Sequence, residues 1–176
     1  MKEIEEIDAQ LTPILERLVS MSMHLSFEYV CELSDKEMIA KQTYQGIYRI
    51  DIFTSRDNDD FASWVAKFRA EWDLPEYSKK FTCTTKDKRI SRHGVLEDWM
   101  PLYIGKSKKV GVRVSDHLNL PLEARTFALK IQSRPNMRYR RFRLSTIPLN
   151  VQNYDLIAPI LERELRERLN PIVGKQ

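Results

Sequence analysis

The stretch from Tyr103 to His117 constrains this chain more than any other. It reads YIGKSKKVGVRVSDH, a short apolar run that ends in glycine and is followed by basic residues. This pattern predicts a strand that leads through a turn into a helix beginning near Lys109. On that helix Arg113 and His117 lie one turn apart on one face, and Lys106 leaves the turn just before them. Three such groups indicate a site for a phosphate-sized anion, although a solvated helix face would show the same spacing.

A second stretch, residues 46–53, predicts a strand that is buried or half-buried. It reads GIYRIDIF, in which residues 47, 49, 51 and 53 alternate with residues 48, 50 and 52. Such alternation is typical of a strand, and the glycine at position 46 opens it.

Together the two stretches resemble the signature of the GIY-YIG endonuclease superfamily, which includes homing, repair and restriction nucleases. The first motif is Gly46-Ile47-Tyr48 and the second is Tyr103-Ile104-Gly105. Arg113 and His117 follow Tyr103 by ten and fourteen residues, the positions that the family expects. The resemblance covers residues 46–53 and about 99–174. Residues 1–45 and the insert of residues 54–98 lie outside it.

The family also has a metal-binding glutamate on a later helix. Residues 157–169 predict such a helix, because apolar residues recur every fourth position and Asn170-Pro171 ends it. Glu162, nine residues before Pro171, is the expected ligand. Glu164 and Glu167 are alternatives that we expect to be solvated and paired with neighbouring arginines. Many relatives have asparagine about twelve residues after the glutamate, where this chain has Gly174.

The resemblance implies an α+β (α/β) fold with a small three-stranded antiparallel or mixed sheet flanked by helices. It also implies metal-dependent hydrolysis of double-stranded DNA with Mg²⁺ or Mn²⁺. Glu162 would hold the ion, Arg113 would brace the scissile phosphate, and Tyr48 would act as a base or a relay. Tyr103, Lys106 and His117 would complete the site. A free phenol has a pKa of about 10, so Tyr48 needs nearby cations to act as a base.

Positive charge is concentrated on the part of the chain that carries the motifs. Residues 1–45 hold four basic and nine acidic side chains, so the net +4 of the whole chain leaves +9 on the remainder. Such a surface suits a polyanion, although charge spread for solubility is the alternative. Two basic segments are candidate DNA contacts: Lys79, Lys80, Lys86, Lys88, Arg89 and Arg92 in the insert, and Arg134, Arg138, Arg140, Arg141 and Arg143 further along.

The rest of the sequence predicts one domain of 176 residues with helical and loop additions. A helix is expected over Ile4 to Leu18, interrupted at Pro13, which packs on the domain or on a second copy in a homodimer. Further helices are expected over 59–72, with Asp59 or Asp60 in the first turn, and over 122–132. Residues 79–93 read as a loop that is mobile or simply solvated. A third strand is expected over 142–147.

Composition favours a cytoplasmic protein without a membrane segment. No apolar run is long enough to span a bilayer, the N-terminus lacks the pattern of a secretion signal, and two cysteines are too few for a disulfide framework. Three functions remain open: an active DNA endonuclease, a DNA-binding module that does not cut, and a nuclease that acts on RNA.

Overall fold

The computed structural model describes residues 1–54 and 60–175 and has an α+β fold. Its main sheet is antiparallel, with strand order β1-β5-β2-β4. The strands span β1 Glu28–Glu32, β2 Gly46–Phe53, β4 Trp99–Ser107 and β5 Phe142–Pro148. The predicted strands β2, β4 and β5 are therefore confirmed, and the predicted sheet of three strands was one strand too small.

The extra strand β1 extends the sheet beyond β5. Its sequence, EYVCE, has charged residues at both ends and is mostly exposed or half-buried, with only Cys31 buried. An edge strand pairs on one side and covers little core, so it carries a weak hydrophobic pattern. That weakness is why the sequence did not predict it.

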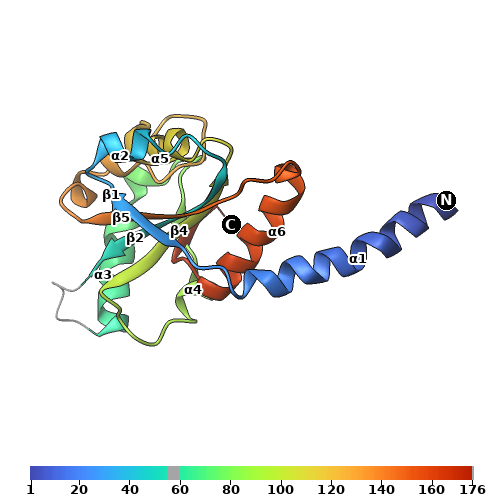
Figure 1. The fold of residues 1–176 in the computed structure, drawn as a ribbon. Helices are drawn as coiled ribbons and strands as arrows, with labels where there is room; N and C mark the ends of the chain where they lie inside the picture. The colour runs from blue at the N-terminus through green and yellow to red at the C-terminus, as the bar shows by residue number, and fades with distance from the viewer. Residues whose placement is uncertain (55–59, 176) are drawn as a thin grey trace.

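Two hydrophobic cores lie on opposite faces of the sheet. Tyr48, Ile50 and Ile52 of β2 pack with α5 (Val110–Asn119) and α3 (Phe61–Trp72). Ile47 and Ile104 pack on the other face with α6 (Tyr154–Leu169). The predicted helices at 110–119 and 157–169 are thus confirmed, and Figure 1 shows α5 and α6 on different sides of the sheet. A short helix, α2 (Lys36–Ala40), covers α5.

The N-terminal helix α1 (Lys2–Ser22) projects away from the domain (Figure 1). It runs through Pro13 as one helix, so the predicted interruption was wrong. Only its C-terminal end is anchored: the Arg168 guanidinium on α6 donates to the carbonyls of Ser22, Met23 and Leu25 at 2.5–2.8 Å. These bonds satisfy carbonyl groups that a helix end otherwise leaves without partners.

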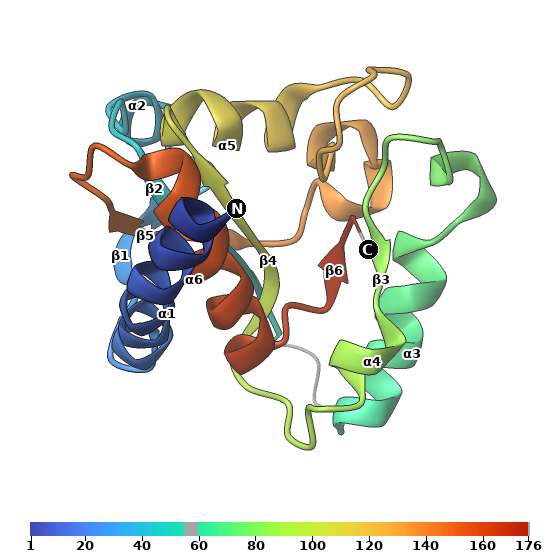
Figure 2. The same ribbon diagram turned by 90° about the vertical axis from the view of Figure 1, so that its right-hand side faces the viewer.

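The insert between β2 and β4 is folded onto the domain. α3 begins after Asp60, whose carboxylate accepts the Ser63 N–H at 2.8 Å, whereas Asp59 lies outside the described residues. Residues 79–93, expected as a loop, contain β3 (Thr84–Thr85) and α4 (Asp87–Ile90). β3 pairs with β6 (Val173–Gly174), which follows α6, and Figure 2 shows β6 between β4 and β3.

The helix predicted over residues 122–132 is absent from that segment, which the structure describes in full. Only one short 3-10 turn, Ile131–Ser133, lies at its end. Lys130 adopts a left-handed conformation with φ 55°, and its ammonium donates to the carbonyls of Leu122 and Ala124 at 2.8 Å. The carbonyl groups of Leu122 and Ala124 therefore accept hydrogen bonds from a buried lysine side chain instead of from the backbone N–H groups of a helix.

Two more 3-10 turns, Pro75–Tyr77 and Pro135–Met137, complete the elements. Among the described residues, no helix has the length and apolar character that crossing a membrane requires.

Candidate active site

A buried cluster of two tyrosines and a histidine lies between β2, β4 and α5. Tyr48 stands directly opposite Gly105 in the β2–β4 pair, and its hydroxyl lies 2.8 Å from His117 Nε2. The Tyr103 ring packs on both, at centroid distances of 6.2 Å from Tyr48 and 4.6 Å from His117. Tyr48 and His117 are almost fully buried, whereas Tyr103 is half-buried. The two sequence motifs therefore meet at one place.

Gly105 is required for this packing. A Cβ atom at position 105 would lie 2.5 Å from the Tyr48 hydroxyl and 2.8 Å from the Tyr103 ring. Only glycine lets the two tyrosines stand this close to the β4 backbone.

The hydrogen bonds of His117 define its tautomer. Its Nδ1 accepts the backbone N–H of Leu129 at 3.0 Å, so Nδ1 carries no proton. A neutral imidazole then has its proton on Nε2, which donates to the Tyr48 oxygen. Burial, and after it the charge of Arg113, lower the pKa of His117 well below 6.5 and keep the ring neutral. Sequence reasoning missed the role of Leu129, because a backbone N–H leaves no signal in the sequence.

Arg113 lies on the same face of α5 as His117, one turn earlier. Its guanidinium donates to the Phe127 carbonyl and pairs with Asp116 at 3.6 Å. Arg113 is also hydrogen-bonded to Tyr48. Burial, followed by the neighbouring Tyr103, raises the pKa of Tyr48 well above 10, and the Arg113 charge lowers it in part. In this state Tyr48 is a protonated phenol.

Glu162 lies on α6, which packs on the opposite face of the sheet from α5. Its carboxylate accepts the Lys106 ammonium at 2.9 Å and pairs with Arg166 at 3.6 Å, and it is 9% exposed. Lys106 sits opposite Ile47 and shares the α6 face of the sheet. Glu164 pairs with Arg163, and Glu167 is exposed, so Glu162 is the best placed of the three carboxylates.

The two groups of side chains act on each other electrostatically. Burial raises the pKa of Tyr103 to about 12, with a further contribution from Glu162, whereas Arg113 and Arg166 lower it. Glu162 acts in the same direction on Tyr48. Arg113 is hydrogen-bonded to Tyr48, whereas Glu162 acts on the two tyrosines through its charge.

The carboxylates suit only a weakly held, hydrated metal ion. Within residues 1–54 and 60–175 there is no group of three or more His, Cys, Asp or Glu side chains that could hold one. Glu162 alone is available, already neutralised by Lys106 and Arg166. Mg²⁺ fits such a donor set, because it prefers oxygen and commonly keeps several waters beside one or two carboxylates.

The predicted DNA-binding arginines of residues 134–143 have different environments. Arg134 is 1% exposed, stacks on Trp72 at 4.2 Å and donates to the Leu129 and Trp72 carbonyls. Arg134 is part of the core and cannot contact DNA, because the segment that precedes β5 packs against Trp72 of α3. Arg143 is half-buried and pairs with Asp51 at 2.8 Å.

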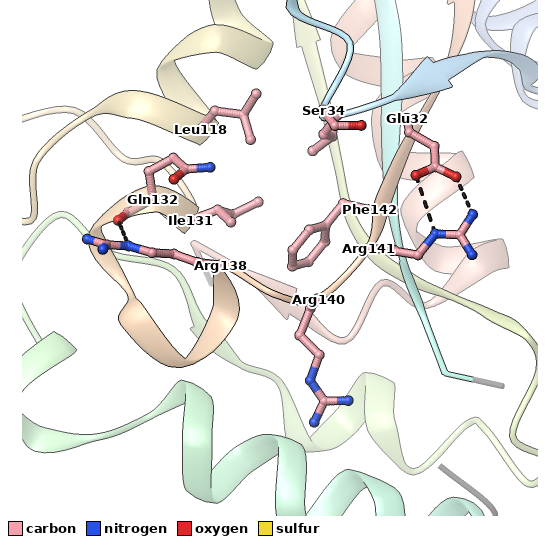
Figure 3. A pocket seen from close by; sticks show the side chains of 10 residues that line it. Glu32, Ser34, Leu118, Ile131, Gln132, Arg138, Arg140, Arg141 and Phe142 are labelled. Atoms are coloured by element: carbon pink, nitrogen blue, oxygen red, sulfur yellow. Dashed lines mark hydrogen bonds and ion pairs between the residues drawn. The ribbon is translucent and has the colours of Figure 1, made fainter. Parts of the chain in front are cut away.

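The other three arginines line a cavity of about 120 Å³ beside β1 and β5 (Figure 3). Arg138 donates to the Gln132 carbonyl, Arg141 pairs with Glu32, and Arg140 pairs with Glu71 at 3.4 Å. This cavity is at the far end of β5 from Thr146, the residue that faces Tyr48 across the sheet. It is therefore separate from the tyrosine cluster.

The basic residues of the insert lie in two places. Lys79 and Lys80 are exposed on the chain that leads to β3. The other four surround α4 and line a cleft of about 770 Å³ against α6: Lys86, Lys88, Arg89 and Arg92. Gly174, where the family resemblance would place asparagine, lies next to Arg89.

Comparisons with known proteins give no indication of function. No family model matches the chain, and neither a curated protein nor a solved structure matches it.

Proposed function

We propose that this protein is a metal-dependent endonuclease that hydrolyses phosphodiester bonds in double-stranded DNA, as its likeness to the GIY-YIG superfamily implies. The observation that supports the proposal is the cluster of Tyr48, Tyr103, Arg113 and His117, together with Glu162 on α6, whose charge acts on both tyrosines. All five are residues that the resemblance requires.

Arg113 would bind the scissile phosphate. Its side chain is 22% exposed, and its guanidinium is fixed by the Phe127 carbonyl and Asp116. A fixed guanidinium next to developing negative charge stabilises a transition state without further reorganisation.

Tyr48 would relay the proton of the attacking water, or remove it once nearby cations lower the phenol pKa that burial raises. His117 Nε2–H donates to its oxygen, so the bond stabilises a phenolate more than a phenol. His117 itself has no free lone pair to take the proton, since Nδ1 is occupied by Leu129. The histidine therefore tunes and positions Tyr48 rather than acting as the base.

Glu162 would hold Mg²⁺ or Mn²⁺, which supplies charge neutralisation for the phosphate and the departing oxygen. Lys106 has to release the carboxylate for this, and its ammonium then becomes available to a DNA phosphate. The 35% exposed side chain of Lys106 is free to make that change.

A plasmid assay tests the proposal. We expect the wild-type protein to nick supercoiled DNA with Mg²⁺, and Glu162→Gln and Arg113→Ala to lose about 100-fold or more in rate. Glu164→Gln is the matched control, because it changes a carboxylate two positions away on the same helix that pairs with Arg163. Thermal unfolding of each variant separates a lost site from a lost fold.

A DNA-binding module that does not cut is the second candidate. It is favoured by the ion pairs of Glu162 with Lys106 and Arg166, which leave the carboxylate neutralised without a metal. Absence of cutting with Mg²⁺ and Mn²⁺ on plasmid and on long linear DNA, with binding retained, would establish this candidate instead. Parallel digestion of RNA distinguishes the third reading, a ribonuclease.

A further inference from the structure

A basic cleft lies between α4 of the insert and the C-terminal half of α6. It encloses about 770 Å³ and is lined by five basic and two acidic side chains together with Asn170: Lys86, Lys88, Arg89, Arg92, Arg166, Asp87 and Glu167. A cleft of this charge suits a segment of phosphate backbone.

The wall formed by α4 is fixed on both sides. Before it, the Lys86 N–H donates to the Ile172 carbonyl at 2.9 Å, and β3 pairs with β6. After it, the His93 ring nitrogen Nε2 is hydrogen-bonded to the Asn170 carbonyl at 2.8 Å. Because this short helix is held by the main domain at both ends, its side chains are already in place before a ligand binds. Binding then costs less conformational entropy.

Arg89 extends from α4 across Gly174. A Cβ atom at position 174 would lie 2.8 Å from Arg89 Nη1, so the side chain passes where any other residue would place its Cβ. Arg89 is half-buried in this position. Glycine at 174 therefore leaves room for the end of this side chain, which a larger residue would displace.

Arg89 lines the same cleft as Arg166, whose guanidinium lies 3.6 Å from the Glu162 carboxylate of the candidate active site. Burial, followed by the neighbouring charge of Arg166, lowers the pKa of Arg89, whereas Tyr103 and Glu162 raise it. Arg166 in turn pairs with Glu162, and its buried Nε has no hydrogen-bond partner among the described residues. Two guanidinium groups that repel each other at the edge of a catalytic cluster are stabilised by an anion between them.

We propose that Arg89, carried by the insert and backed by Arg166, binds the DNA phosphate next to the one that is cut. The inference rests on the proposed function, because it assigns the substrate path of that same site. The insert then contributes directly to the active site, and DNA enters along the cleft between α4 and α6.

The first test measures binding without a divalent ion, and so does not depend on cutting. Anisotropy of a short fluorescein-labelled DNA duplex is followed over a series of salt concentrations. We expect Arg89→Ala to reduce the slope of log K against log salt by about 1, the loss of one phosphate contact. Arg89→Lys should retain the slope and bind more weakly, since it keeps the charge and loses the guanidinium fork. Arg17→Ala, on the projecting helix, should change neither.

The second test measures the rate of cutting at saturating DNA. The rate for Arg89→Ala should fall about tenfold or more, whereas Lys36→Ala, which removes an exposed charge on α2 outside the cleft, should keep the wild-type rate. Equal rates for the two variants would overturn the assignment next to the scissile phosphate.

The third test uses Gly174. Gly174→Ala should displace the Arg89 guanidinium and reduce the salt slope as Arg89→Ala does, and the double variant should lose no more than either single one. Additive losses, or an unchanged slope in Arg89→Ala with the fold intact by thermal unfolding, would refute the proposal. If the wild type binds and does not cut, the binding results still decide the role of Arg89, while the proposed endonuclease function fails separately.

Discussion

At the scale of single residues, the site depends on small features of the backbone. His117 is positioned by an N–H of Leu129, and the two tyrosines are close together because position 105 has no side chain. The identities of Tyr48, Tyr103, Arg113, His117 and Glu162 could be predicted from motifs and spacing. The tautomer of His117 and the ion pairs of Glu162 could not, since they depend on atoms brought together only by the fold.

Gly105 offers a direct test of this packing. Gly105→Ala should reduce cutting by about 100-fold, because the added methyl group displaces the Tyr48 hydroxyl from His117. Gly94→Ala is the control, since its Cβ would meet no atom within 4 Å. Rates from the plasmid assay would be compared, and wild-type activity in Gly105→Ala would show that Tyr48 has no part in the reaction.

His117 should also make stability depend on pH. Because burial and Arg113 lower its pKa in the folded state, the unfolded chain binds the extra proton first as pH falls below about 6.5. The free energy of unfolding should therefore decrease with falling pH, by up to about 1.4 kcal/mol per pH unit from this group.

Urea denaturation at neutral pH and at about pH 5 measures the effect. His117→Gln should show a shallower decrease than the wild type. The exposed His24 provides the control, and His24→Gln should follow the wild type. Parallel curves for wild type and His117→Gln would contradict a buried neutral imidazole.

At the scale of elements, predictions succeeded where a segment carries a strong period. The strands predicted at 46–53 and 103–105 and the helix predicted at 157–169 have regular apolar patterns, and they lie within β2, β4 and α6. The helix predicted over 122–132 is absent because the buried Lys130 ammonium binds the carbonyls of Leu122 and Ala124 in the same segment. Strand β1 was missed because an edge strand needs few apolar residues. The prediction that Arg134 contacts DNA was wrong for another reason. Its place in a basic run indicated a surface residue, whereas the structure buries it in the core.

The helix α1 carries an exposed stripe that predicts a homodimer. Ile4, Ile7, Leu11, Ile14 and Leu18 recur at alternating steps of three and four, the heptad spacing of a coiled coil, and Ile4, Ile7 and Ile14 are each more than half exposed. A second copy of the same stripe is the partner that this spacing fits. Two joined sites would also allow both DNA strands to be cut in one binding event.

Sedimentation velocity tests this prediction, because it measures the oligomeric state of the protein. The wild type should sediment as a dimer and Ile7→Glu as a monomer, because a charge at the centre of the stripe prevents its burial. Gln10→Glu, exposed on the same helix and outside the stripe, should remain a dimer. A monomeric wild type at all concentrations would exclude a dimer through α1.

At the scale of the whole molecule, residues far apart in the chain complete one site. The insert follows β2, yet it is tied to residues 170–174 after α6. Length and composition predicted a single domain, but nothing in the sequence of residues 79–93 indicated which distant segment they pair with. Local patterns define elements, whereas the partners of short strands such as β3 depend on the complete fold.

The pairing of β3 with β6 also has a consequence for the order of assembly. During synthesis on the ribosome, Thr84 and Thr85 emerge about ninety residues before the strand with which they pair. Until residues 172–174 leave the exit tunnel, Arg89 has no backbone to lie against. The nascent chain therefore cannot form the basic cleft between α4 and α6 before that point, and the proposed DNA path is completed in one step.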